Sequence, residues 1–166
     1  VTRNGGANIS LPSENEWYKA AYYSAGGVYF DYPTGTDTAT GCVAPGSDTG
    51  NSANCYPYTH PPGSLTDAGA YGLSDSPYGT YDQGGNVWEW NEQIVSGSDR
   101  GLRGGSWSSN ASNPAASSPS DASPPYADDP IGFRVATLVP EPDASPLAMI
   151  VLAGLAARQE RRKRNL

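Results

Sequence analysis

GGNVWEW, residues 84–90, is the stretch that decides the fold. Its paired glycines and Asn86 predict a tight turn, and the aromatic run after them predicts a strand that leaves the turn. Downstream, LRGGSW (residues 102–107) and IGFRVA (residues 131–136) predict two more short strands. The segment between them, residues 108–130, is rich in Ser, Pro, Ala and Asp and predicts a loop.

Upstream, LPSENEW (residues 11–17) predicts the clearest helix. Ser13 and Glu16 have the spacing of a capping box, in which side chain and backbone satisfy each other at the first turn. Trp17 and the alanines at positions 20 and 21 fall on one helical face. The glycine pair 26–27 predicts the end of this helix.

Composition indicates a domain dominated by turns. The 166 residues include 20 Gly and 15 Pro, and only 16% are charged. Four Trp and 11 Tyr are available to build a core, because each aromatic ring buries a large area. Residues 1–138 carry 5 basic and 14 acidic residues, which excludes nucleic acid as a partner, because phosphates need Lys and Arg. An acidic surface is compatible with calcium, whose ligands are carboxylates and carbonyls.

These segments, together with YGTYD (residues 78–82), resemble in their order the formylglycine-generating enzyme family, or sulfatase-modifying factor domains. The resemblance runs from about residue 11 to 136 and implies an irregular α+β fold like that of C-type lectins, with little regular secondary structure. The family's N-terminal portion has no counterpart here, and the opening VTRNGG contains no signal peptide. We therefore expect residues 1–138 to be an N-terminally truncated domain of this family.

The resemblance also implies calcium. It places one ion on the side chains of Asp82 and Glu89 and the carbonyls of Gly85 and Val87. From the residues alone, a surface turn with two solvated acids is the favoured interpretation, and only the resemblance favours calcium. A second family site would use Asn54 and the carbonyl of Cys55, although its downstream Asp partner is not recognisable in this sequence.

Tryptophans and arginines near these motifs are interpreted structurally. Trp88, Trp90 and Trp107 are expected in the core rather than on a sugar-binding platform. Arg103 and Arg134 are expected to tie loops together by charge-assisted hydrogen bonds rather than to bind substrate.

The catalytic ligands of the resembled family are missing. Formylglycine generation uses two thiolates to hold copper(I), a soft metal that prefers sulfur. In the family these cysteines lie three and eight residues after the Ser of the Gly-Gly-Ser motif, which is Ser106 here. The corresponding residues are Ser109 and Pro114, neither of which can offer a thiolate. Copper is therefore not expected, and the single histidine, His60, is expected in a loop rather than as a base.

The two cysteines, Cys42 and Cys55, are separated by residues rich in Gly, Ser and Asn. In an exported protein they are candidates for a disulfide. The alternative is two free, unrelated thiols. Neither has a neighbouring base or a CxxC partner, so a redox or zinc site is not expected.

The C-terminal tail, residues 139–166, has three parts in order. A Pro140-Glu141-Pro142 motif begins a stiff spacer, the charge-free and largely apolar run 144–157 predicts a hydrophobic helix, and a basic cluster follows. The cluster consists of Arg158, Arg161, Arg162, Lys163 and Arg164. The apolar run is shorter than the roughly 20 residues of a full membrane span. The tail resembles the PEP-CTERM sorting signal of Gram-negative bacteria, which implies transient anchoring in the inner membrane, an exosortase partner, and delivery to the cell envelope or surface.

Two functions remain open from the sequence. The first is a non-catalytic, surface-displayed module that binds an extracellular peptide or glycan. The second is an oxidoreductase that acts on the cysteine of sulfatases and is completed by the missing N-terminal part.

Overall fold

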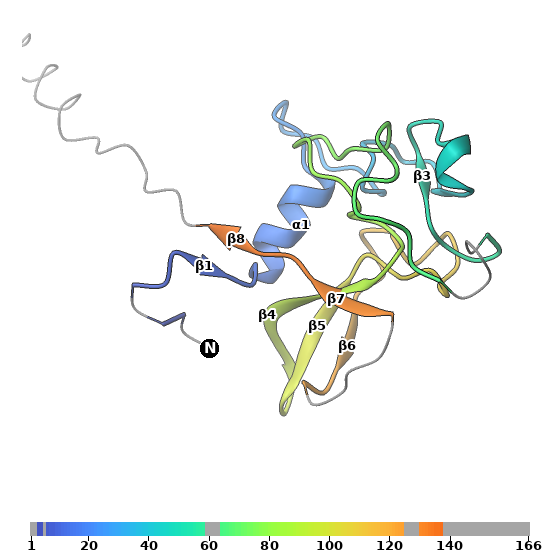
Figure 1. The fold of residues 1–166 in the computed structure, drawn as a ribbon. Coiled ribbons are helices and arrows are strands. Elements are labelled where there is room, and N and C mark those ends of the chain that lie inside the picture. The colour runs from blue at the N-terminus through green and yellow to red at the C-terminus, as the bar shows by residue number, and fades with distance from the viewer. Residues whose placement is uncertain (1–2, 5, 59–63, 125–129, 138–166) are drawn as a thin grey trace, which may run out of the picture. The chain divides into compact units, whose positions relative to one another are not determined.

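The computed structural model describes residues 3–4, 6–58, 64–124 and 130–137 (Figure 1). The chain divides into two units, Val1–Ala136 and Thr137–Leu166. The Pro-Glu-Pro motif, the hydrophobic helix expected at 144–157 and the basic cluster lie outside the described residues, as does His60. Within the described ranges no helix is long and apolar enough to cross a membrane.

Helix α1 (Glu14–Tyr22) begins as its sequence predicts. Ser13 is the N-cap: its hydroxyl accepts from the backbone N–H of Glu16 at 3.2 Å, and the Glu16 carboxylate accepts from the backbone N–H of Ser13 at 2.7 Å. The helix ends earlier than the glycine pair 26–27, because Tyr23 adopts an extended backbone. Tyr23 then pairs with Tyr29 in an isolated β-bridge.

The largest sheet in the described residues has four strands, and one of them begins at Trp88, directly after the glycine turn (Figure 1). Its order is β6 (Ser120–Ala122), β5 (Asp99–Arg103), β4 (Trp88–Ser96) and β7 (Ile131–Phe133). β4 is antiparallel to β5 and parallel to β7, with Glu89 opposite Arg103 on one side and Gly132 on the other. β5 ends at Arg103, before the glycines that the sequence placed inside the strand, and β6 lies in the segment predicted as loop.

The remaining elements are short. β1 (Ile9–Ser10) and β8 (Ala136–Thr137) form one two-stranded sheet. β2 (Gly41–Cys42) and β3 (Ser52–Ala53) form a second, parallel one, and a 3-10 turn spans Pro45–Ser47. The described residues are thus mostly short strands and turns with one α-helix, as the glycine and proline content predicted.

The core is small and centred on α1. Trp17 and Tyr22 are fully buried and meet edge to face, with ring centroids 5.9 Å apart. Trp88, Trp90 and Trp107 are only half-buried, so the expectation that they form the core is wrong. The fully buried tryptophan is Trp17 on the helix, which forms the buried cluster with Ala21 and Tyr22.

Candidate functional site

The loop after β5 carries the residues at the family's catalytic positions. It begins with Gly104, which has a positive φ of 94°, and an added Cβ would lie 2.9 Å from the carbonyl oxygen of Gln83. Only glycine can make this turn without moving backbone. The turn places Ser106 in the interior, where it is fully buried.

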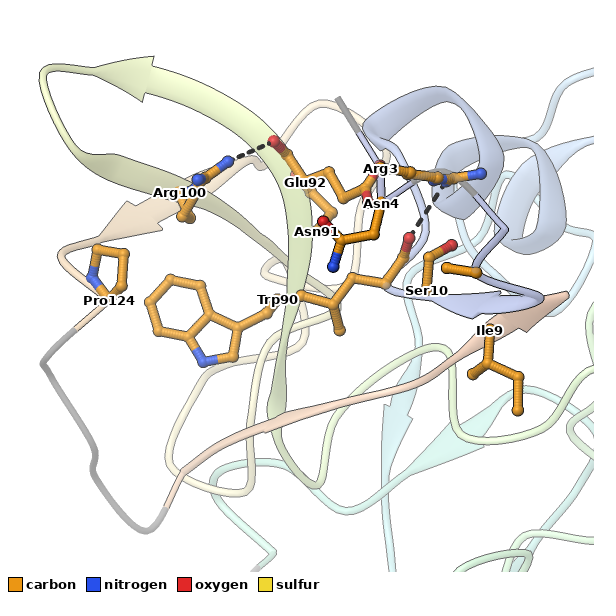
Figure 2. Close-up of a pocket in the computed structure, with 11 residues that line it drawn as sticks. Arg3, Asn4, Ile9, Ser10, Trp90, Asn91, Glu92, Arg100 and Pro124 are labelled. Carbon is orange, nitrogen blue, oxygen red and sulfur yellow. Dashed lines mark hydrogen bonds and ion pairs between the residues drawn. The ribbon is translucent and has the colours of Figure 1, made fainter. Parts of the chain in front are cut away.

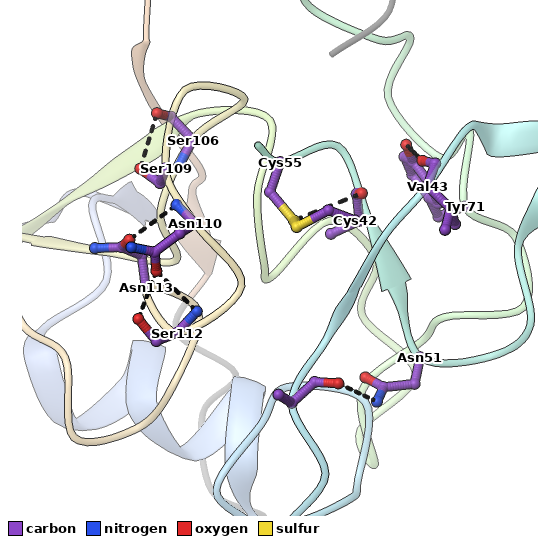
Figure 3. Close-up of a disulfide and its surroundings, with 12 residues drawn as sticks. Cys42, Val43, Asn51, Cys55, Tyr71, Ser106, Ser109, Asn110, Ser112 and Asn113 are labelled. Atoms are coloured by element: carbon purple, nitrogen blue, oxygen red, sulfur yellow. Dashed lines mark hydrogen bonds between the residues drawn. A yellow bond between two sulfur atoms is a disulfide. The ribbon is translucent and has the colours of Figure 1, made fainter. Parts of the chain in front are cut away.

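Three serine hydroxyls meet at the start of this loop, and Figure 3 shows two of them, those of Ser106 and Ser109. Ser106 Oγ lies 3.0 Å from Ser108 Oγ and 3.1 Å from Ser109 Oγ. The backbone N–H of Ser106 also donates to Ser109 Oγ at 3.0 Å. The Ser109 hydroxyl is therefore a structural hydrogen-bonding group that closes the turn.

Pro114 ends the loop in a fully buried position. Its carbonyl accepts a hydrogen bond of 2.8 Å from the hydroxyl of Tyr22 on α1. Between Ser109 and Pro114 the chain is folded by side-chain hydrogen bonds, in which Asn110 accepts from the backbone of Ser112 and Asn113 accepts from that of Asn110 (Figure 3). The position of the second family cysteine is thus filled by a ring that has no ligand atom and packs in the interior.

Cys42 and Cys55 are joined by a disulfide beside this loop (Figure 3). Of the two alternatives that the sequence left open, the structure has the bridge. The next residue, Tyr56, donates its backbone N–H to the carbonyl of Ser109 at 2.8 Å. The bridge therefore holds the 42–55 segment against the loop, and it uses both thiols that the chain possesses.

The polar side chains of this loop carry hydroxyl and amide groups. Within the described parts of the chain, no group of three or more His, Cys, Asp or Glu side chains is arranged to hold a metal ion. Hydroxyl and amide groups form hydrogen bonds but are poor ligands for soft metals.

The turn at Glu89 does not fit a calcium ion. Glu89 is only 5% exposed, and its Oε1 accepts from Arg134 Nη2 at 2.7 Å. Its Oε2 accepts both from Arg134 Nε and, at 2.7 Å, from Trp17 Nε1. Arg134 Nη2 also donates to the carbonyl of Asp82 at 3.0 Å. The guanidinium of Arg134 therefore supplies the positive charge between Asp82 and Glu89, and a calcium ion would have to displace it.

Other members of the expected ligand set have protein partners too. The Asp82 carboxylate accepts from the backbone N–H of Gly69 at 2.6 Å, and the Gly85 carbonyl accepts from Val87 N at 2.8 Å. Arg134, as expected, ties loops together. Arg103 does the same: it pairs with Glu14 and donates to the carbonyl of Ala116 at 2.7 Å.

Asn54, of the second expected calcium site, has a different environment. It is 1% exposed, and its amide nitrogen donates to the carbonyl of Ser64 at 3.1 Å and to Asn86 Oδ1 at 3.2 Å. Its side-chain oxygen is buried and has no hydrogen-bond partner in the described structure. An orphaned buried oxygen of this kind fits a bound cation or an ordered water.

Comparisons with known proteins agree on one family. The family model described as "Sulfatase-modifying factor enzyme 1-like domain" matches residues 5–139. Two proteins named "Inactive C-alpha-formylglycine-generating enzyme 2" are similar in sequence. The one from Bos taurus is 31% identical over 142 residues, which is 76% of this chain and 43% of that protein. The one from Mus musculus is 32% identical over 147 residues, which is 80% of this chain and 44% of that protein.

Solved structures with a similar fold include "Treponema denticola variable protein 1", with a TM-score of 0.59 and 28% identity over 78% of this chain and 47% of that one. The protein CarF gives a TM-score of 0.57 and 26% identity over 82% of this chain and 51% of that one. PvdO from Pseudomonas aeruginosa gives 0.56 and 21% identity over 81% of this chain and 54% of that one, a likeness of fold alone. The chain spans less than half the length of the curated relatives it matches.

Proposed function

The chain belongs to the sulfatase-modifying factor enzyme 1-like family, and from this membership we propose that it is a binding and display module without formylglycine-generating oxidase activity. The proposal concerns this chain alone, which covers 43–44% of the curated relatives.

One observation carries the proposal: no free thiol is available where the family chemistry needs two. Ser109 and Pro114 hold the two family cysteine positions, and the chain's only cysteines are joined to each other. Copper(I) held by oxygen ligands alone is disfavoured because it is a soft ion. The name "inactive" carried by the two curated relatives supports the same reading.

A copper(I) titration tests the proposal directly. The full chain, with its disulfide intact, is titrated in competition with a chromogenic copper(I) chelator, and a cysteine-containing sulfatase peptide is then analysed by mass spectrometry. We expect no stoichiometric copper and no conversion of the peptide thiol to an aldehyde. The variant Cys42→Ser/Cys55→Ser is the matched control, because any copper that the native thiols bind after reduction is lost in it. Aldehyde formed by the unmodified chain would overturn the proposal and favour the alternative, a sulfatase-modifying oxidoreductase.

We propose that the tail directs surface display. The order of Pro140-Glu141-Pro142, an apolar run and a basic end supports export to the envelope of a Gram-negative bacterium, with transient anchoring in the inner membrane and an exosortase as partner. Replacing the three-residue motif by alanines should leave the protein in the inner-membrane fraction, whereas Glu160→Ala in the same tail should not. Normal surface delivery of the triple-alanine variant would contradict this role.

We propose calcium at Asn54, with the carbonyl of Cys55 as a second ligand, and not at Glu89. Support comes from the buried Asn54 side-chain oxygen that has no partner in the described structure. A bound ion would link the disulfide segment to the 64–66 segment, which already accepts a hydrogen bond from Asn54. Calcium should raise the melting temperature of the native chain, and the rise should vanish in Asn54→Ala. Superimposable melting curves in calcium and in chelator would remove calcium from the proposal.

A further inference from the structure

A cavity of about 570 Å³ lies between N-terminal residues beside β4 and the residues Arg100 and Pro124 (Figure 2). This volume lies in the range of sites for small molecules. One wall is lined by Arg3, Asn4, Ala7, Ile9, Ser10 and Leu11, and the other includes Trp90, Arg100 and Pro124. The Ser106–Pro114 loop does not line it, so this is a separate site.

The walls are mainly apolar. Trp90 is half-buried, and Ile9 keeps 62% of its surface exposed. Leu11 and Pro124 add aliphatic surface to the same hollow. An aromatic or branched aliphatic group would cover this surface and gain free energy from its removal from water.

Within the described residues, Arg100 lines this cavity without a carboxylate partner. Of the four arginines in the described residues, Arg3, Arg103 and Arg134 are paired with carboxylates. Arg100 is the exception: within the described residues its guanidinium makes a single hydrogen bond, in which Nη1 donates to the carbonyl of Glu92 at 2.9 Å. Its other N–H groups are therefore free to donate to an anion in the cavity.

Two of the neighbouring polar residues, Arg3 and Asn91, already have side-chain partners. Arg3 donates from Nε to Glu92 at 2.9 Å and pairs with Glu16. Asn91 donates to Glu14 at 2.6 Å and accepts from the backbone of Gln93 at 2.9 Å. Arg100 therefore remains the charged partner for a ligand with one anionic group.

We propose that this cavity binds a small organic carboxylate with an aromatic or branched aliphatic body. The carboxylate lies against the guanidinium of Arg100 in a bidentate contact, and the body lies against Trp90, Ile9 and Pro124. The inference deepens the proposed binding function, because it names a ligand class for the module. It does not depend on the copper chemistry of the Ser106–Pro114 loop.

Calorimetric titration of the full chain tests the site with hydrocinnamate and its neutral analogue hydrocinnamamide. We expect hydrocinnamate to bind about tenfold or more tightly than the amide, since a charge-assisted hydrogen-bond pair contributes about 1.5–3 kcal/mol. Arg100→Gln should remove this preference and Trp90→Leu should weaken both ligands. Lys19→Gln, which removes an exposed cation elsewhere, should change neither.

Equal affinity of the native chain for the acid and the amide would overturn the proposal, and so would absence of hydrocinnamate binding. This comparison uses unmodified protein, so it holds even if Arg100→Gln folds poorly. Retention of the acid preference in a folded Arg100→Gln variant would also refute it. None of these outcomes changes the expected result of the copper titration, so the two proposals fail separately.

Discussion

Glu89→Leu is predicted to be among the most destabilising single substitutions in this domain. The Glu89 carboxylate, 7% exposed in its side chain, accepts hydrogen bonds from Arg134 and from the fully buried Trp17. Removing it leaves a guanidinium without its counter-ion and an indole N–H without an acceptor. Breaking a buried ion pair from one side costs about 3–5 kcal/mol.

Partial exposure of Arg134 sets the size of the effect. Its side chain is 24% exposed, so the freed guanidinium regains some water, and we expect the lower end, about 3 kcal/mol. This is a large share of a typical stability of roughly 5–15 kcal/mol. The melting temperature should fall by about 10 °C.

Urea unfolding followed by tryptophan fluorescence measures the loss, with the exposed Asp75→Asn as the control. The double variant Glu89→Leu/Arg134→Met should be more stable than the sum of the single losses predicts, by about 1–3 kcal/mol. The loss in Glu89→Leu should be the same in calcium and in chelator. Additive losses would refute the ion pair, and a loss confined to calcium-containing buffer would restore Glu89 as a calcium ligand.

Three further changes test other parts of the fold. The Arg3 guanidinium lowers the pKa of Glu16 to about 2, below the ordinary 4.5. Its contribution to the free energy of unfolding is therefore complete above about pH 4.5 and lost as the pH falls towards 2. From urea unfolding, this free energy should fall in that window by less than about 1 kcal/mol more than in Glu16→Gln, since Glu16 is exposed. Cys42→Ser/Cys55→Ser should lower the free energy of unfolding by about 2–4 kcal/mol, measured without reductant; equal stability would contradict the bridge. Ser13→Ala should cost about 1 kcal/mol of stability against Ser117→Ala as control, and equal urea midpoints for the two would deny the capping box.

Local signals in the sequence predicted those parts of the fold that are fixed by near neighbours. The capping box of Ser13 and Glu16 joins residues three positions apart, so its pattern is visible in the sequence. The turn before Trp88 was visible for the same reason. Gly85 has a φ of 73°, a local conformation that favours glycine, so the glycine itself marks the turn.

Parts fixed by distant neighbours were not predictable. β6 has no apolar alternation and exists because its backbone pairs with β5, with Arg100 opposite Ala122. The end of α1 is set by tertiary contacts, among them the bridge between Tyr23 and Tyr29. The Arg100 cavity had no sequence signal, because its walls come from segments about 80 residues apart that only the fold brings together.

The prediction of calcium at Glu89 rested on neighbours in the sequence alone, and the structure gives this carboxylate other partners. An acidic residue beside a glycine turn is a reasonable oxygen ligand when its neighbours are unknown. The residues that engage it, Arg134 and Trp17, lie 45 and 72 positions away. Arg134 was expected to tie loops together, but its partner could not be identified from spacing.

The missing copper ligands are part of the packing and not two isolated changes. The Ser109 hydroxyl closes the turn at Ser106, and the Ser109 carbonyl holds Tyr56 next to the disulfide. Pro114 is buried, and its carbonyl anchors Tyr22 of the core helix. A thiol introduced at position 109 would weaken a hydroxyl network, and one at position 114 would replace a rigid ring in a filled space. The residues that stabilise the loop are therefore the same ones that leave it without soft ligands. For this reason we propose that the chain is a binding module and not a dormant oxidase.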